Sequence, residues 1–211
     1  MCAAGQPTLR SAKIDAAALV GSRILVVGND DAEAISIIQG TISRVDRNAP
    51  EYSGSYSDFN INYYQASMNL SSGISGSPAI AEDGCVVGMV SGGLVNGESI
   101  CYLLPLWPLL KTLGYLRRSE RVPRGDIHCR FSTTPFHECR RLELSSERER
   151  QLRRDVTATR GLLVVETVLA GPASGKVMVA DILLTVNGAT VTHPVALEAI
   201  FDENVGGTVE I

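Results

Sequence analysis

Apolar positions along the chain come in short runs separated by polar turns, and few stretches keep a helical period for long. Val20–Gly28 and Ala34–Val45 have the length and the β-branched content of strands. Arg47–Asn60 is rich in Asn, Pro, Gly, Ser and Asp and predicts a long loop, from which Tyr63–Ser67 leads out. The 20 glycines among 211 residues agree with a chain of strands and turns.

The middle of the chain changes from strand to helix. A turn at Asp83-Gly84 precedes an apolar strand that ends in small residues. The apolar run Tyr102–Leu116 contains two prolines and, from Trp107 on, predicts a short helix. Arg117–Arg124 contains four arginines and one proline, so we expect a linker there rather than a surface for nucleic acid.

The last third of the chain mixes strands with two helices. Ser146 and Glu149 form a capping-box pattern at the start of a charged helix that ends near Arg154. Gly206-Gly207 stops a second helix. The predicted elements are the strand Asp126–Ser132, the charged helix, the strands within Arg160–Glu166 and Ala180–Gly188, and the helix Pro194–Asn204. This order predicts a small α+β domain after the linker.

The segment around Ser75 has the composition of a nucleophile turn. Gly73 and Gly76 permit a tight turn in unusual backbone geometry, with the Ser75 hydroxyl at its apex. The same turn can direct the N–H groups of Gly73 and Ser75 at one point, where they would stabilise the oxyanion formed during acyl transfer. The alternative is an ordinary surface turn built from Ser and Gly.

Small residues follow at a position where a protease needs them. Ser91, Gly92 and Gly93 end the next apolar strand, so a substrate backbone can lie alongside as an extra strand. Because these three residues are small, they would leave room for the substrate side chain before the scissile bond. Ser91, Gly92 and Gly93 are therefore candidate substrate-binding residues, and protein or peptide substrates are the expected partners.

Several motifs together resemble those of the HtrA/Deg serine proteases, most closely the large eukaryotic branch described as nuclear and pro-apoptotic. The matching segments besides the Ser75 turn are Asn29-Asp30, Ile42–Tyr52, Tyr56–Asn60, Gln65-Ala66, Tyr102–Leu106 and Phe136–Leu142. The resemblance implies a chymotrypsin-like, or trypsin-like, β-barrel and peptide-bond hydrolysis through an acyl-enzyme on Ser75. It also implies that Arg47–Asn60 is an activation loop beside the catalytic site; the alternative is a plain surface loop. A homo-oligomer is a further partner to consider.

The resemblance divides the chain into residues 1–118 of a protease domain, a linker at 119–124, and a PDZ-like domain at 125–211. In the PDZ-like order, Gly161 would let a turn expose the N–H groups of Leu162, Leu163 and Val164 to a peptide C-terminal carboxylate, and Arg160 would add charge. The strand Leu163–Thr167 would then pair with the peptide main chain. The alternative for these residues is a tight turn before a buried strand.

Histidine positions set a limit on the catalytic interpretation. His128, His137 and His193 all follow Ser75, whereas the chymotrypsin order places histidine and aspartate before the serine. We therefore expect a fragment that has the C-terminal half of the protease barrels and ends inside its PDZ-like domain. Two alternatives stay open, a reversed order that uses His128 or His137, and a non-catalytic peptide-binding protein that retains a relic half-barrel. Ile74 also departs from the family pattern, which has a small polar residue there.

Composition narrows the partners further. A formal net charge of −4 and a pI near 5.4 disfavour nucleic acid and anionic membranes. Five cysteines in no framework spacing favour reduced thiols, hence an intracellular protein of the nucleus or cytoplasm. The pairs His128-Cys129 and His137/Cys139 lack zinc-ligand spacing, and no metal or cofactor is expected. No apolar run approaches the ~18 residues of a membrane span.

Overall fold

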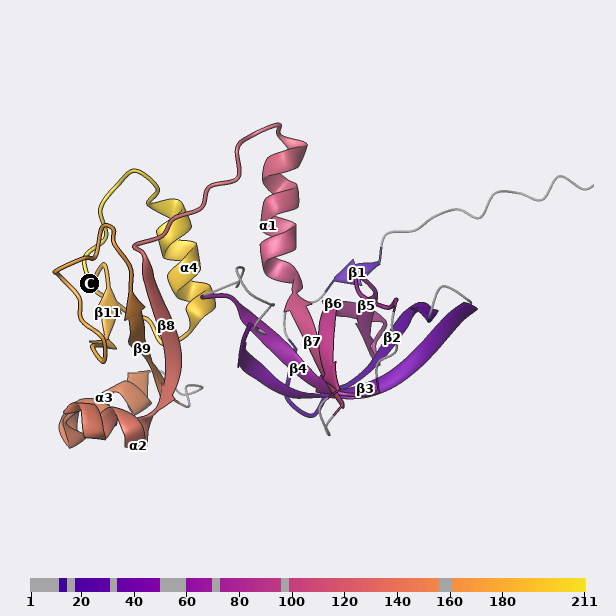
Figure 1. The fold of residues 1–211 in the computed structure, drawn as a ribbon, viewed down its shortest axis with the longest axis horizontal. Coiled ribbons are helices and arrows are strands. Elements are labelled where there is room, and N and C mark those ends of the chain that lie inside the picture. The colour runs from indigo at the N-terminus through magenta and orange to yellow at the C-terminus, as the bar shows by residue number, and fades with distance from the viewer. Residues whose placement is uncertain are drawn as a thin grey trace, which may run out of the picture. The chain divides into compact units, whose positions relative to one another are not determined.

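The computed structural model describes residues 12–14, 18–30, 34–49, 60–69, 73–95, 99–155 and 161–211 (Figure 1). It divides into two compact units. Unit 1 comprises Met1–Val45 and Tyr63–Lys111, and unit 2 comprises Asp46–Asn62 and Thr112–Ile211. Each unit has its own sheet and its own apolar core.

Unit 1 is built on a closed six-stranded barrel. The sheet has the strand order β6-β5-β2-β3-β4-β7, and the additional pairing of β6 with β7 closes it. The short β1 joins the beginning of β6 in parallel. The elements are β1 (Lys13–Ile14), β2 (Arg23–Asp30), β3 (Ala34–Asn48), β4 (Asn62–Ser67), β5 (Pro78–Ala81), β6 (Cys85–Val95), β7 (Ser99–Pro105) and α1 (Leu106–Arg117). The ends of β3 and α1 and the first residue of β4 fall in unit 2.

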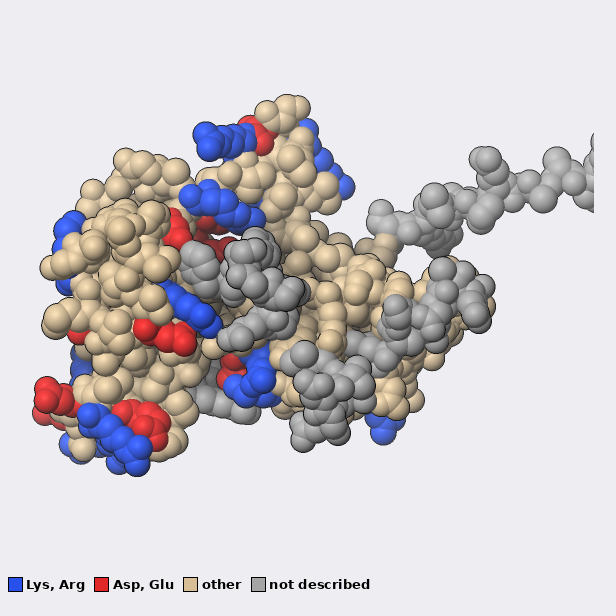
Figure 2. Space-filling view, viewed as in Figure 1, with Lys and Arg blue, Asp and Glu red and all other residues tan. Residues whose placement is uncertain are grey.

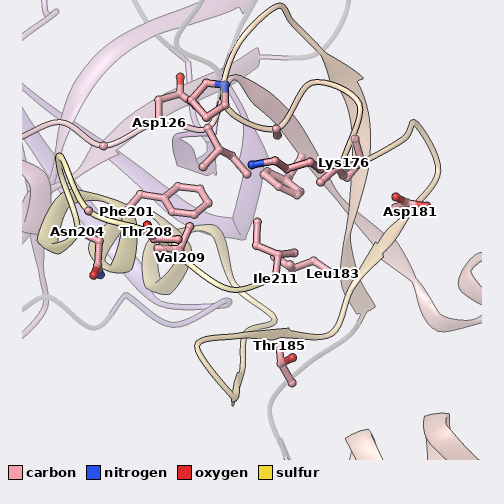
Figure 3. A pocket seen from close by; sticks show the side chains of 18 of the residues that line it. Asp126, Lys176, Asp181, Leu183, Thr185, Phe201, Asn204, Thr208, Val209 and Ile211 are labelled. Atoms are coloured by element: carbon pink, nitrogen blue, oxygen red, sulfur yellow. The ribbon is translucent and has the colours of Figure 1, made fainter.

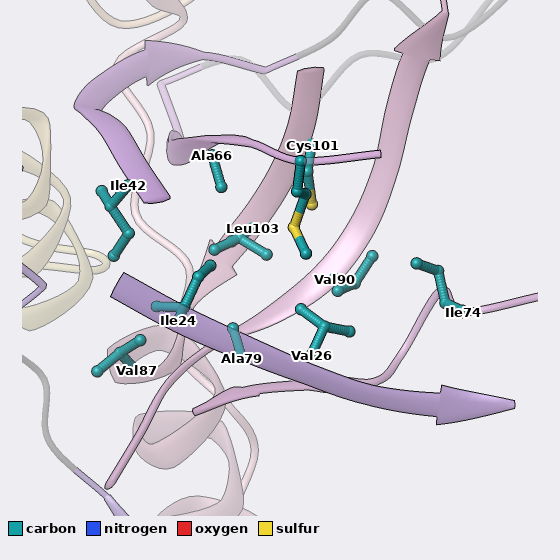
Figure 4. Packing of buried hydrophobic residues seen from close by; sticks show 11 residues of the cluster. Ile24, Val26, Ile42, Ala66, Ile74, Ala79, Val87, Val90, Cys101 and Leu103 are labelled. Carbon is teal, nitrogen blue, oxygen red and sulfur yellow. The ribbon is translucent and has the colours of Figure 1, made fainter. Parts of the chain in front are cut away.

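Alternation along the strands fills the barrel. Ile24 and Val26 of β2 point inward and are almost fully buried, whereas Leu25 between them is 43% exposed. Their partners come from β6, β7 and the turn that carries Ser75, as Figure 4 shows for Val90, Leu103 and others. The predicted mainly β barrel is therefore confirmed for this part of the chain.

Unit 2 contains a three-stranded sheet with helices on it. The sheet has the order β10-β9-β8, and β11 and β12 form a separate hairpin. The elements are β8 (Cys129–Pro135), α2 (Phe136–Cys139), the 3-10 turn η1 (Arg140–Leu142), α3 (Ser146–Asp155), β9 (Gly161–Val168), β10 (Ile182–Leu183), β11 (Thr185–Val186), β12 (Ala189–Thr190) and α4 (Pro194–Glu203).

The central strand β9 supplies side chains to two apolar clusters. Leu163 and Val165 pack in the cluster that includes residues of α4, whereas Leu162 and Val164 pack in the cluster that includes residues of α2 and α3. This alternation explains why the predicted run of apolar residues is continuous, since both faces of the strand are covered. Arg153 of α3 adds a cation–π contact, with its guanidinium carbon 4.0 Å from the centre of the Phe136 ring.

Charged side chains over α2 and α3 are of both signs and lie close together (Figure 2). Arg153 and Arg140 both approach the Glu149 carboxylate, at 2.9 and 3.4 Å, and Arg141 approaches Glu138 at 3.1 Å. This intermixing leaves little net field for a polyanion at these helices.

Element boundaries differ from the sequence predictions where a turn intervenes. The first long strand begins at Arg23 rather than Val20, because Gly21 has a positive φ and Ser22 closes a turn. The β8 strand begins three residues later than predicted, because the Asp126 carboxylate accepts a hydrogen bond from the His128 N–H at 2.7 Å. The cap of α3 is Ser145, whose hydroxyl accepts from the Arg148 N–H at 3.2 Å, so the predicted capping role of Ser146 is wrong.

Candidate functional site

The turn Gly73–Ser77, here called the Ser75 turn, places its serine in solvent. Gly73 and Gly76 have φ values of 92° and 88°, which L side chains rarely adopt, so both glycines are required by the backbone. Ser75 between them is exposed. The exit of the turn is fixed to β6, since the Gly76 N–H donates to the Val90 carbonyl at 2.7 Å and the Val90 N–H donates to the Ser77 carbonyl at 2.9 Å.

Ile74 anchors the Ser75 turn from below. Its side chain is 2% exposed and belongs to the barrel core (Figure 4). Gly28 of β2 leaves the space that the turn occupies, because a Cβ atom at Gly28 would overlap the Ser77 hydroxyl and lie 3.2 Å from the Ile74 Cγ2. An apolar residue at position 74 therefore serves packing, and its side chain points away from the exposed face that carries Ser75.

The main chain at the apex is free to bind an anion. Among the described residues, no hydrogen bond involves the Ser75 N–H or its hydroxyl. The Ser77 N–H, in contrast, donates to the Ile74 carbonyl at 3.0 Å and so tightens the turn. An unpaired N–H beside an exposed hydroxyl is the arrangement that acyl transfer uses for its oxyanion.

The predicted substrate-binding residues lie on β6 just after its contact with the Ser75 turn. The ladder between β6 and β7 shifts register between Val90 and Gly92, so Ser91 forms a bulge. Within the described part of the chain, no strand pairs with Gly92–Val95 on the edge away from β7. A Cβ atom at Gly92 would meet nothing within 4 Å. Ser75 and an open strand edge are thus positioned by the same residue, Val90.

The peptide-binding residues predicted in unit 2 do not form an exposed site. Leu162 and Leu163 are fully buried and Val164 is 6% exposed. Strand β9 pairs with β8 along one edge, and with β10 at Leu163 and Val164 along the other. The predicted pairing of a peptide with Leu163–Thr167 is therefore wrong for the centre of this strand, because its backbone groups already have partners.

Gly161 has a different role from the one predicted. A Cβ atom at Gly161 would overlap the Thr134 carbonyl, so this glycine permits close contact between β9 and β8 rather than an exposed turn. Leu162 pairs with Thr134 of β8 and is fully buried, so it lies within the sheet rather than in an exposed turn. Arg160 lies outside the described residues. The alternative, a buried strand, describes these positions.

Strand β8 forms one edge of the unit 2 sheet, and Asn60, which is hydrogen-bonded to this edge, lines a small cavity beside α4. One wall of this cavity is the helix face made by Pro194, Leu197, Glu198, Phe201 and Asp202, and the cavity volume is about 180 Å³. The other lining residues are Asn60, Ile61, Arg124, Gly125 and Asp126. We call the space between β8 and this face the α4 groove.

Asn60 occupies the β8 side of the α4 groove. Its amide nitrogen donates to the Cys129 carbonyl at 2.7 Å, and its amide oxygen accepts from the Phe131 N–H at 2.8 Å. No local sequence pattern signals this contact, since Asn60 stands 69 and 71 residues from its partners in a segment of turn formers. At the far wall, buried Asp202 accepts from the Gly125 N–H at 2.9 Å and from Arg124 at 3.2 Å.

A larger cavity in unit 2 lacks the residue combination of a catalytic site (Figure 3). It has a volume of about 900 Å³ and opens onto Leu183, Phe201 and Val209, all members of the α4-side apolar cluster or packed against it. Lys176 and Asp181 stand at its rim. Its lining contains no serine, cysteine or histidine.

The histidines and cysteines have structural environments. His128 Nδ1 lies 2.8 Å from the Ala170 carbonyl, and His193 Nδ1 accepts the Val195 N–H at the start of α4. Burial raises the pKa of the Cys101 thiol to about 12. No group of three or more His, Cys, Asp or Glu side chains is placed to hold a metal ion in the described ranges. None of the helices described is long and apolar enough to cross a membrane.

Comparisons with known proteins agree on one family. Residues 3–89 match the model of the trypsin-like peptidase domain. The chain is 48% identical over 195 residues to the pro-apoptotic serine protease NMA111 of Phaeosphaeria nodorum and, over the same length, to that of Pyricularia oryzae. Each alignment covers 92% of this chain and 19% of the relative, so the chain spans about a fifth of the length of these curated relatives.

Solved structures show the same fold. An HtrA-type protease, AlgW with a tripeptide, superposes with a TM-score of 0.60 at 17% identity, covering 92% of this chain and 61% of that chain. The serine endoprotease of Yersinia pestis gives a TM-score of 0.51 at 22% identity, with 93% and 58% covered.

Proposed function

We propose, from the membership of this chain in the HtrA family of trypsin-like serine proteases, that Ser75 is the nucleophile of a serine endopeptidase. The observation that carries the proposal is the Ser75 turn itself. Ser75 is exposed between two glycines of positive φ, next to the buried Ile74, and its N–H has no hydrogen-bond partner among the described residues. The Ser75 oxygen attacks a peptide carbonyl, and the N–H groups of Gly73 and Ser75 stabilise the oxyanion.

The substrate would be a protein or peptide in extended conformation. Its main chain would pair with β6 at Ser91, Gly92 and Gly93, and this would bring its scissile carbonyl to the Ser75 turn, because Val90 of β6 is hydrogen-bonded to that turn. No acidic residue lies among Ser91–Gly93, and the space above Gly92 is open, so a small or medium apolar side chain would fit before the scissile bond.

The reaction also needs a base that takes the hydroxyl proton and returns it to the leaving amine. Unit 1 has no histidine in its sequence, since all three histidines belong to unit 2. We therefore expect the base and its orienting acid from residues other than those of unit 1, and the much longer relatives make a further segment the first candidate. Removing the base from a serine protease costs roughly 10⁶ in rate.

The test is labelling by a fluorophosphonate, which modifies only activated serines. In the longest natural form of the protein, Ser75 should be labelled, Ser75→Ala should abolish labelling, and Ser77→Ala should retain it. The 211-residue chain by itself should label far more slowly. Equal labelling of wild type and Ser75→Ala would refute the role of Ser75.

A separate variant tests the substrate edge. Gly92→Val should fold, because the space above Gly92 is empty. It should slow cleavage of an unfolded protein such as casein while it leaves fluorophosphonate labelling of Ser75 unchanged, since the small probe does not need the strand edge. Loss of both activities together would place Gly92 in the turn's structure rather than in substrate binding.

We also propose that unit 2 is a PDZ-like module that binds extended peptides, with peptide C-termini as the expected ligands. The observation in favour is the α4 groove, where a sheet edge with hydrogen-bonding groups lies beside a helix face that offers Pro194, Leu197 and Phe201. The HtrA-type neighbours named above include one with a bound tripeptide. Three further features stay predictions, namely the domain boundaries at 118 and 125, a homo-oligomer and a nuclear location. A fluorescent fusion would test the nuclear location.

A further inference from the structure

We infer that Asn60 holds the β8 edge closed and that a peptide must displace it to enter the α4 groove. The inference rests on the proposed peptide-binding function of unit 2 and adds an internal competitor to it. The side-chain amide offers one donor and one acceptor, to the Cys129 carbonyl and the Phe131 N–H. These are the groups that the main chain of an added strand would offer.

The backbone of Asn60 is set for this contact. Its φ is 63°, in the left-handed region where asparagine is among the few tolerated side chains. This conformation turns the chain at the point where the amide meets β8. Ile61 follows directly and lines the cavity with Asn60, so two successive residues of this segment fill the space beside the helix face.

Asn60 and Ile61 border the helix as well as the strand. Both line the cavity together with Leu197 and Phe201 of α4. In the described residues, Asn60 supplies the only side-chain hydrogen bonds to the main chain of Cys129 and Phe131 on this edge.

When Asn60 competes with a peptide for the β8 edge, the apparent affinity for the peptide equals the intrinsic affinity multiplied by the fraction of molecules in which Asn60 has left the edge. Two hydrogen bonds between uncharged groups, each with a modest net value, correspond to roughly 10- to 30-fold in that fraction. A peptide would therefore bind the unmodified protein weakly, and loss of the Asn60 amide would strengthen binding by about this factor.

Asn60→Gly is the decisive variant because glycine accepts the positive φ and removes only the amide. The matched control is Ser119→Gly, another residue of unit 2 with a positive φ, 57°, and an exposed position away from the cavity lining. The probes are fluorescein-labelled decapeptides with apolar last residues, each made with a free and an amidated carboxyl end, and fluorescence anisotropy measures their binding.

We expect Asn60→Gly to bind these peptides roughly tenfold or more tightly than wild type, and Ser119→Gly to bind like wild type. Amide hydrogen exchange supplies the second readout. Exchange at Phe131 should accelerate in Asn60→Gly and slow again when peptide is added.

Equal affinity in wild type and Asn60→Gly would overturn the inference and leave peptide binding by unit 2 intact. Peptide binding that does not protect the Phe131 amide would also overturn it, since the site would then lie elsewhere. Failure of every peptide to bind any of the three proteins would refute the peptide-binding function and the inference together.

Discussion

Truncation of Ile74 should loosen the Ser75 turn and destabilise unit 1 by a predictable amount. The side chain is 2% exposed, so Ile74→Ala removes three buried carbons, about 2.4 kcal/mol at ~0.8 kcal/mol each. The cavity left behind raises this to about 3 kcal/mol, whereas Ile74→Val should cost only about 1 kcal/mol. Exposed Ile37 is the matched control, because Ile37→Ala at 66% exposure should change stability by less than about 0.5 kcal/mol.

Urea unfolding followed by tryptophan fluorescence measures these differences in the stability of unit 1. The chain has one tryptophan, Trp107, and it belongs to unit 1. Hydrogen exchange at the Gly76 N–H, which donates to Val90 at 2.7 Å, reports the turn itself and should accelerate in Ile74→Ala. If Ile74→Ala shifted the urea midpoint no more than Ile37→Ala, the side chain would not be an anchor and the reasoning would fail.

Three further outcomes follow from unit 2 and the thiols. Burial lowers the pKa of His193. Unit 2 should therefore keep full stability above the ordinary histidine pKa of ~6.5 and lose some stability as the pH falls below it. His193→Asn, which retains a cap, should flatten this pH dependence in urea unfolding followed by circular dichroism. Asp202→Ala leaves the Gly125 N–H without its acceptor and should cost about 1–3 kcal/mol in the same assay, with Asp202→Asn less damaging. With a pKa near 12, Cys101 should resist iodoacetamide at pH 8 until urea unfolds the barrel, whereas partly exposed Cys85 should react before Cys101 in peptide mapping.

Local patterns predicted much of the architecture. Alternation and β-branched runs located the barrel strands, and the helices that begin near Trp107, Ser146 and Pro194 are present with small changes at their ends. The two glycines around Ser75 predicted a turn with positive φ, because few other residues accept that conformation. These features depend on residues close together in sequence.

Features that depend on distant pairing were missed. A continuous apolar run at Leu162–Val165 is compatible with an exposed binding turn or with a strand covered on both faces, and only its pairing with β8 and β10 decides between them. The sequence shows that Ile74 departs from the family pattern but not that it packs in the barrel core, because that packing involves Gly28 in another strand. The Asn60 contact with β8 crosses about 70 residues and has no local pattern.

Closure of the barrel also affects how one copy of the chain meets another. An open sheet offers its edge strands as templates on which further chains can add and aggregate. Here β6 pairs with β7, and the part of its other edge without a partner strand among the described residues, Gly92–Val95, is short, follows the bulge at Ser91 and contains two glycines. Bulges and glycines make poor templates for a long ladder, so the edge that would admit one substrate strand disfavours growth into a fibre.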